Sequence, residues 1–163
     1  MEIILAKSAG FCFGVQRAVD TAYKEAGKQH VYTYGPIIHN EEVVTDLGKK
    51  GVRVLENEQE LKNLMEGTVV IRSHGVPKEI YEVIEEKGLE CVDATCPFVR
   101  KIHKIVERES KAGRHIIIVG NDTHPEVEGI KGWCEGPVTV ISSHEEAENL
   151  AFPEGEKLCV VSQ

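Results

Sequence analysis

The stretch Gly35–Glu41, GPIIHNE, returns 85 residues later as Gly120–Glu126, GNDTHPE, and both fit the pattern Gly-x-x-x-His-x-Glu. Each copy directly follows a continuous β-branched run, Val31–Tyr34 in the first case and Ile116–Val119 in the second. Such runs are typical of strands that are covered on both faces of a sheet. Each copy therefore marks the end of a predicted strand, and a helical pattern follows it.

Three further pairs of segments match in the same order along the chain. They are Cys12–Arg17 with Cys96–Lys101, 84 residues apart and both fitting Cys-x-x-Val-x-(Arg/Lys); Leu55–Leu64 with Ile141–Leu150, 86 apart; and Val70–Ser73 with Cys159–Ser162. Four matches in one order at a nearly constant offset indicate a duplicated unit. The period is far too long for a solenoid repeat.

Short strand-like runs alternate with amphipathic segments throughout. The predicted strands are Ile3–Ala6, Val31–Tyr34, Val52–Leu55, Val69–Arg72, Glu90–Asp93, Ile116–Val119, Val138–Ile141 and Leu158–Val161. Strict alternation of strands and helices predicts parallel sheets with helices on both faces. The predicted fold class is therefore α/β, with duplicated small α/β units whose parallel β-sheets are flanked by helices. We expect an N-terminal strand and loop at residues 1–13, a first unit at 14–96 and a second unit at 97–163.

Capping residues indicate where several helices begin and end. Asn40 has the character of an N-cap. Pro77 and Pro97 suit the first helical position, and Gly88 is placed to close the helix that begins at Pro77.

Composition narrows the class of protein. Of 163 residues, 41% are hydrophobic and 28% are charged, which excludes a disordered or collagen-like chain. No apolar run approaches a membrane span, and the start lacks the basic flank of a signal peptide, so we expect a cytoplasmic protein. The net charge of −8 argues against a nucleic-acid surface and leaves any anionic ligand to local groups.

The repeat separates the five cysteines into two groups. Cys12 and Cys96 occupy equivalent places, each after a strand-like segment and just before a helix, whereas Cys91, Cys134 and Cys159 have no cysteine counterparts. A helix N-terminus favours the thiolate, so the matched pair suits soft-metal ligation or redox chemistry. We interpret Cys91 and Cys159 as core residues and Cys134 as structural. The plainer alternative for the pair is two helix-capping cysteines.

Three of the seven histidines follow predicted strands directly, namely His39, His74 and His124. Ligands bind beyond the carboxyl ends of strands in open parallel sheets, so these loops are expected to share one edge with the two cysteines. Imidazoles beside free helix N–H groups make a plausible cradle for phosphate. His30, His103, His115 and His144 are expected to be surface residues.

Glu41 and Glu126 are equivalent under the repeat, two residues after His39 and His124. A carboxyl at that place could be a general acid whose pKa is raised by burial. It could equally be a first-turn glutamate that complements the helix dipole. The residues alone do not choose between Glu41 and Glu126.

Five segments together resemble the LytB/IspH family of 4-hydroxy-3-methylbut-2-enyl diphosphate reductases. They are Ala9–Val15 (AGFCFGV), Gly35–Asn40 (GPIIHN), Arg72–Val76 (RSHGV), Asp93–Pro97 (DATCP) and Thr123–Val127 (THPEV). The resemblance implies a pseudo-threefold trefoil of three similar α/β units around a [4Fe-4S] cluster. It implies reductive removal of the substrate's allylic hydroxyl, giving isopentenyl diphosphate and dimethylallyl diphosphate as the last step of the non-mevalonate pathway.

The same resemblance implies individual roles. Cys12 and Cys96 resemble two of three cluster ligands, while His39, His74 and His124 resemble contacts to the allylic diphosphate. Glu126 resembles the proton-delivering acid, which breaks the tie with Glu41. Three thiolates would leave one iron of the cluster free to act as a Lewis acid on the substrate hydroxyl. The implied electron donor is of the ferredoxin or flavodoxin type.

The family is longer and uses a third cysteine, so we predict that this chain is an N-terminal fragment with about two of the three units. Residues 1–13 would then pack against the third unit, and the fragment alone would be inactive. Two alternatives stay open. One is a non-catalytic module that binds diphosphate, and the other is a zinc or mononuclear metal site formed by Cys12, Cys96 and a histidine.

Overall fold

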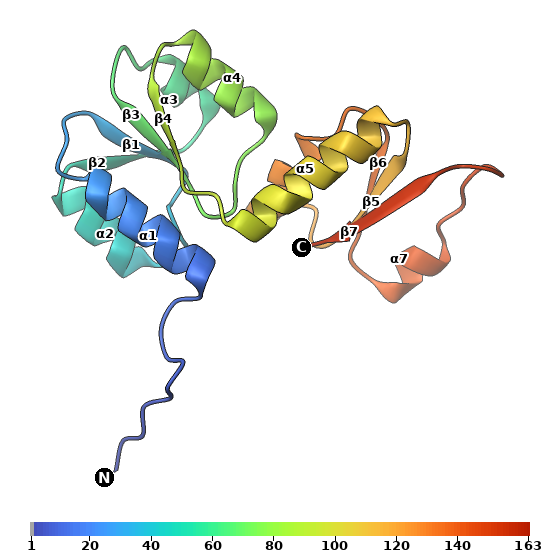
Figure 1. Ribbon diagram of the computed structural model, residues 1–163, viewed down its shortest axis with the longest axis horizontal. Coiled ribbons are helices and arrows are strands. Elements are labelled where there is room, and N and C mark those ends of the chain that lie inside the picture. The colour runs from blue at the N-terminus through green and yellow to red at the C-terminus, as the bar shows by residue number, and fades with distance from the viewer. Residues whose placement is uncertain (1) are drawn as a thin grey trace.

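The computed structural model describes residues 2–163, and Met1, the first residue of the predicted N-terminal segment, lies outside the described residues. Two parallel sheets form in succession along the chain (Figure 1). The first unit contains α1 (Phe13–Glu25), β1 (Val31–Tyr34), α2 (Glu41–Lys49), β2 (Val52–Leu55), α3 (Glu58–Lys62), β3 (Thr68–Ile71), α4 (Lys78–Glu86) and β4 (Glu90–Asp93). The second contains α5 (Pro97–Lys111), β5 (His115–Val119), α6 (Pro125–Lys131), β6 (Val138–Ile141), α7 (His144–Glu148) and β7 (Leu158–Ser162).

The strand order repeats as the sequence matches predict. The first sheet has the order β2-β1-β3-β4 and the second β6-β5-β7, with every pair parallel. Helices alternate with these strands, so the predicted α/β class and the duplication are confirmed. The fourth strand of the first sheet has no counterpart among the described residues of the second.

Strand register corrects one of the sequence matches. Tyr34 pairs with Ile71 on β3, and the equivalent Val119 pairs with Ser162 on β7. Ser162 therefore corresponds to Ile71, and its predicted equivalence to Ser73 was wrong by two residues. The cause is the connection between β6 and β7, which is longer than the connection between β2 and β3 and shifts the alignment.

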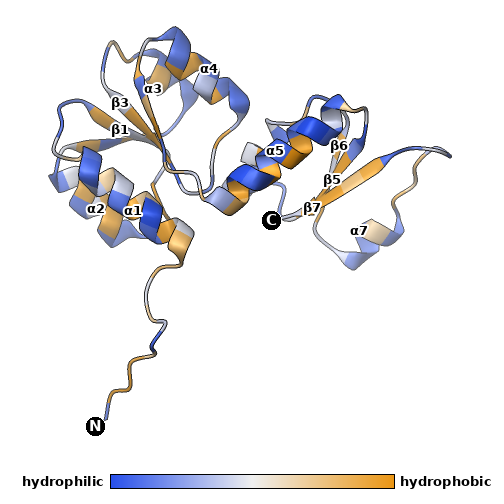
Figure 2. Ribbon diagram, viewed as in Figure 1, coloured by the Kyte–Doolittle hydropathy of each residue, from blue (hydrophilic) through white to orange (hydrophobic). Residues whose placement is uncertain are grey.

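Apolar side chains cover both faces of the first sheet. The cluster shared with α1 and α2 contains Ala18, Val19, Ala22, Leu47, Val31, Val52 and Val70. The cluster on the opposite face, shared with α3 and α4, contains Leu61, Leu64, Val69, Ile71, Ile80 and Ile84. The second sheet has one such cluster, against α5 and α6, formed by Val106, Ile116, Ile118, Val127 and Ile130. Figure 2 shows the apolar strands between helices whose outer sides are hydrophilic.

The predicted capping residues stand at the helix ends, except that one of them lies one residue outside its predicted position. The Asn40 side chain accepts a 3.0 Å hydrogen bond from the Val43 N–H, as an N-cap should. Pro97 is the first residue of α5, and Gly88, at φ +67°, follows the end of α4. Pro77 is the N-cap of α4 and not its first residue, because its backbone is extended, with ψ 153°.

The strand predicted at residues 3–6 is not formed. Residues 2–12 have no helix or strand, and Ile3, Ile4 and Leu5 are 80 to 84% exposed. Figure 1 shows this segment leading away from both sheets. A strand needs a neighbour to pair its backbone groups, and none of the described strands lies beside it.

The two units meet where the β3–α4 loop reaches α5 and α6. Trp133, just after α6, donates its indole N–H to the Val76 carbonyl at 3.0 Å. The Lys78 ammonium lies 3.2 Å from the Glu107 carboxylate of α5, and its backbone N–H donates to Gly132 at 3.4 Å. These contacts fix the loops of one unit relative to those of the other.

His103 lies at this junction, and its predicted surface position was wrong. It is 2% exposed and stacks on Trp133, with ring centroids 5.3 Å apart. It belongs to the buried stripe of α5, with Val99, Val106 and Ser110, a helical spacing that is visible in the sequence. His115 is also largely covered, whereas His30 and His144 are exposed as predicted. Among residues 2–163, no helix is long and apolar enough to cross a membrane.

Candidate functional site

Three histidines from both units gather at the carboxyl ends of their strands. His39 follows β1, His74 follows β3 and His124 follows β5. Their ring centroids lie 4.7 Å apart for His39 and His74, 5.7 Å for His74 and His124, and 6.1 Å for His39 and His124. The structure therefore brings together the three imidazoles that the sequence singled out.

Burial controls the charge of the central imidazole. Burial, together with the neighbouring His39, Arg72 and His124, lowers the pKa of His74 to about 4. His74 is therefore neutral at pH 7. Its Nδ1 is buried without a hydrogen-bond partner in the protein. A neutral imidazole in this position can still donate one hydrogen bond.

His124 is held by the helix that it begins. It is the N-cap of α6, with an extended backbone before Pro125, and its Nδ1 accepts the Glu126 backbone N–H at 3.1 Å. An imidazole that accepts through Nδ1 carries its proton on Nε2 when it is neutral. The ring can therefore cap the helix through one nitrogen and donate a hydrogen bond through the other.

The two equivalent glutamates differ in environment. Glu126 is half-buried beside His124, and burial raises its pKa although His124 acts in the opposite direction. Glu41 is exposed in the first turn of α2, where a carboxylate complements the helix dipole. Glu126 therefore takes up a proton more readily than an ordinary exposed carboxyl does.

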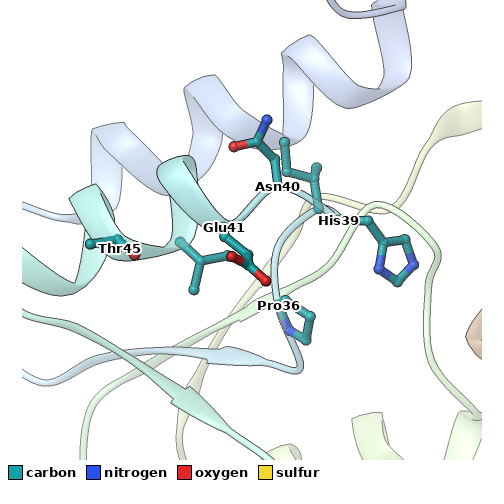
Figure 3. A pocket seen from close by; sticks show the side chains of 7 residues that line it. Pro36, His39, Asn40, Glu41 and Thr45 are labelled. Atoms are coloured by element: carbon teal, nitrogen blue, oxygen red, sulfur yellow. The ribbon is translucent and has the colours of Figure 1, made fainter.

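An open pocket of about 490 Å³ lies at the start of α2, beside the histidine cluster. It is lined by Pro36, Ile38, His39, Asn40, Glu41, Val44 and Thr45. Figure 3 shows Thr45 at one end, Glu41 near Pro36, and the His39 imidazole pointing away from both. His39 is one of the lining residues of the pocket, and its ring also belongs to the cluster with His74 and His124.

Cys96 is joined to the loop that carries His74. Its backbone N–H donates to the Ser73 carbonyl at 2.9 Å. It is the N-cap of α5, and its thiol makes no capping hydrogen bond. The backbone of Cys96 is thus tied to the residue before His74, and its thiol is not used in capping.

Cys12 is the equivalent N-cap of α1, also without a side-chain capping bond, and it is exposed. Two residues later, the buried Gly14 lies against the other thiol, because a Cβ placed there would be 2.5 Å from Cys96 Sγ. The absence of a side chain at Gly14 therefore lets the start of α1 approach Cys96. The structure places both predicted thiols at helix N-termini on the same side of the first unit.

Arg17 is a positioning residue that the sequence interpretation missed. Its guanidinium donates to the carbonyls of Asp93 and Thr95, both at 3.1 Å, and so fixes the segment that leads into Cys96. The sequence did contain a signal, since the basic residue is the last element of the repeated Cys-x-x-Val-x-(Arg/Lys) pattern.

Arg72 is a second residue that was missed. A Cβ on Gly35 would collide with its Nη1, and its Nε donates to the Gly75 carbonyl at 3.4 Å. Arg72 therefore contacts the loops that lead to His39 and to His74. Its equivalent in the second unit is Gln163, so the repeat gave no signal for it.

The other cysteines lie elsewhere. Cys91 is exposed on β4, an edge strand, so its prediction as a core residue was wrong. Cys134 and Cys159 pack against the core of the second unit, and burial raises the pKa of Cys134 to about 11. Among residues 2–163, no three Cys, His, Asp or Glu side chains are grouped so that they could hold a metal ion.

Comparisons with known proteins agree with this geometry. The family model described as LytB protein matches residues 3–163. The 4-hydroxy-3-methylbut-2-enyl diphosphate reductase of Caldanaerobacter subterraneus subsp. tengcongensis is 54% identical over 167 residues, covering 100% of this chain and 57% of that protein. The protein of the same name from Clostridioides difficile is 42% identical, covering 100% of this chain and 58% of its own length.

Two solved structures are also similar. The E-1-hydroxy-2-methyl-but-2-enyl-4-diphosphate reductase of Plasmodium falciparum has a TM-score of 0.89 at 30% identity, covering 96% of this chain and 49% of that one. A structure of (E)-4-hydroxy-3-methyl-but-2-enyl diphosphate reductase, described as the terminal enzyme of the non-mevalonate pathway, has a TM-score of 0.80 at 40% identity. This chain covers 57% of the length of that structure. It also spans 57% of the length of the Caldanaerobacter relative, a little more than half.

Proposed function

The chain belongs to the LytB protein family, and we propose that it forms part of an iron–sulfur oxidoreductase acting on 4-hydroxy-3-methylbut-2-enyl diphosphate. The reaction is a reductive removal of the allylic hydroxyl that yields isopentenyl diphosphate and dimethylallyl diphosphate in the non-mevalonate pathway. The observation that carries the proposal is the cluster of His39, His74 and His124 beside the backbone of Cys96. Two relatives of this chain carry the name of that reductase.

The histidines would bind the diphosphate as hydrogen-bond donors. His74 is neutral because burial lowers its pKa to about 4, and His124 has Nε2 free because Nδ1 caps α6. Neutral donors hold an anion without being charged themselves, and the positive charge nearby comes from Arg72. This assignment fits the acidic chain, which must bind anions through local groups.

The two thiols fit a [4Fe-4S] cluster as two of its ligands. Both are free cysteines at helix N-termini, and neither thiol is used in capping. When bound, the cluster would supply electrons and a Lewis-acidic iron. Gly14 keeps the start of α1 close to the Cys96 thiol, and Arg17 fixes the segment that leads into it.

Glu126 would deliver the proton to the leaving group. Burial raises its pKa, so it holds a proton more readily than an exposed carboxyl does. In the overall reaction, one carbon–oxygen bond of the substrate breaks, two electrons and two protons enter, and the oxygen leaves as water. The electrons would come from a ferredoxin- or flavodoxin-type donor.

A third cluster ligand would come from outside these 163 residues, because Cys91, Cys134 and Cys159 lie away from the site. The two units would then be two parts of the pseudo-threefold arrangement, with residues 1–13 packed against the third. Under this proposal, the 163 residues alone do not turn over substrate.

Titration of this chain with inorganic diphosphate tests the binding half of the proposal. A His39→Ala, His124→Ala variant should bind at least about tenfold more weakly, whereas His144→Ala, at an exposed position, should bind as the wild type does. Equal affinity for all three proteins would contradict the assignment of the histidines.

Reconstitution tests the redox half. A hybrid that joins this chain to the remaining part of the Caldanaerobacter relative should, after anaerobic reconstitution with iron and sulfide, reduce the substrate. The 163-residue chain treated in the same way should not. If the hybrid binds diphosphate and gains no activity, a diphosphate-binding module would be the better interpretation.

A further inference from the structure

His103 is a buried, neutral histidine that the site described above does not use. It is 2% exposed, and burial lowers its pKa to about 4. Its ring stacks on Trp133 at 5.3 Å and 17°, and the Trp133 indole is itself tied to the Val76 carbonyl of the first unit. One face of the imidazole is therefore held by a residue that bridges the two units.

The edge of the imidazole lies against the loop that carries His74. A Cβ placed on Gly75 would be 2.5 Å from His103 Cε1, closer than any side chain could approach. Gly75 also has φ +72°, which favours glycine. The backbone that immediately follows His74 is thus in close contact with a ring of the second unit.

The same ring reaches α6, the helix that His124 caps. A Cβ on Gly129 would lie 3.6 Å from His103 Nε2, 3.6 Å from the Gly75 carbonyl carbon and 3.6 Å from the His74 carbonyl oxygen. The absence of a side chain at Gly75 therefore makes room for the imidazole, and the ring packs beside the place where α6 meets the His74 loop. His103 Nε2 is buried there without a hydrogen-bond partner.

We propose that His103 is a positioning residue that sets the distance between His74 and His124 by packing against both the His74 loop and α6 where these two elements meet. The two site histidines belong to different units, 5.7 Å apart, so their spacing depends on what separates these two elements. A diphosphate bridges donors at fixed separations, and its affinity depends on that spacing. The assignment of a ligand to these histidines rests on the proposed function, whereas their spacing does not.

His103→Leu tests the proposal, because leucine leaves part of the space occupied by the ring empty. His144→Leu is the matched control, since His144 has 88% of its side chain exposed and lies far along the chain on α7. The first readout needs no ligand. NMR cross-relaxation between ring protons of His74 and His124 should be present in the wild type and the control, and lost or at least halved in His103→Leu.

The second readout is binding of inorganic diphosphate. We expect about tenfold weaker affinity in His103→Leu, with unfolding in urea still cooperative. In the wild type, His74→Ala and His124→Ala should be non-additive in their effects on affinity, and in the His103→Leu background they should become additive. A role in stability alone would leave that coupling unchanged.

Unchanged cross-relaxation in a folded His103→Leu, with affinity within twofold of the wild type, would overturn the proposal. If that variant does not fold, His103→Gln, which has a similar length and polarity, provides the same comparison. In the wild type, absent cross-relaxation between His103 Hε1 and the Gly75 Hα protons would also overturn it. If the wild type binds no diphosphate, the proposed function fails, and the cross-relaxation alone decides the role of His103.

Discussion

Val69 and Val160 occupy equivalent positions in the two units, opposite Tyr32 on β1 and Ile117 on β5, yet their surroundings are opposite. Val69 is fully buried, whereas Val160 is 62% exposed. The first sheet has apolar clusters on both faces and a fourth strand beside β3, whereas the second has one cluster, and β7 is an edge. Equal strand order therefore does not mean equal packing, because burial depends on what lies beside each strand.

The functional loops differ in the same way. His39 and His124 are equivalent in sequence, but Asn40 caps α2 while His124 caps α6 with its own ring. The capping role therefore lies one residue earlier in the motif in the second unit. As a result, His124 is fixed by a hydrogen bond to the backbone of Glu126, and His39 stays exposed.

The cysteines should reveal whether both units contribute equally to the metal centre. In the hybrid protein, Cys12→Ser and Cys96→Ser should each abolish the cluster, because each would remove one of the proposed thiolate ligands. Cys91→Ser, on the exposed edge strand β4, should be nearly silent. Iron and sulfide analysis with the visible absorption spectrum measures this, and an intact cluster in Cys96→Ser would remove the central assignment.

Unlike the two cysteines, the two equivalent glutamates should differ, and only the glutamate of the second unit should affect turnover. Glu126→Gln in the hybrid should lower the rate of turnover by about 100-fold or more, since it would remove the proposed general acid, while substrate affinity stays within about twofold. Glu41→Gln should leave turnover nearly unchanged because Glu41 is exposed in the first turn of α2. Steady-state kinetics compares the two, and normal turnover in Glu126→Gln would assign the proton to another group.

Substitution of Val69 and of Val160 tests the difference in packing between the two sheets directly. Val69→Ala should lower the free energy of unfolding of this chain by about 2 kcal/mol or more, through lost burial and a residual cavity. Val160→Ala should change it by less than about 0.5 kcal/mol. Urea denaturation of both variants under one condition is sufficient, and similar losses would show that the face of β7 is better covered than its exposure indicates.

Lowering the pH should produce the smallest change, a loss in the free energy of unfolding that comes from protonation of His74. Its pKa in the folded protein, about 4, lies below the ordinary value of 6.5, so the unfolded chain binds the proton more readily. The stability that the neutral imidazole contributes is complete above pH 6.5 and is lost as the pH falls towards 4. Urea denaturation between pH 7 and 4 should show a shallower decline in His74→Gln than in the wild type, and equal declines would argue against a neutral, buried His74.

Much of the fold could be predicted from local patterns. Seven of the eight predicted strands form, because continuous β-branched runs bounded by turns have few alternatives, and the repeat predicted that the strand order would recur. The strand at residues 3–6 failed because pairing needs a neighbour. Cys91 and His103 failed for a related reason, since their burial depends on the place of β4 in its sheet and on the contact between the units.

The sequence by itself determined which chemistry is present: two matched thiols at helix starts, three histidines after strands and a pair of equivalent glutamates. Only the tertiary structure decided how they differ. Glu126 is half-buried and Glu41 is exposed, although both stand in the same motif, because the two units pack against different neighbours. A repeated pattern fixes the local backbone through short-range interactions, whereas pKa values and spacing between units depend on burial by residues far away in the chain.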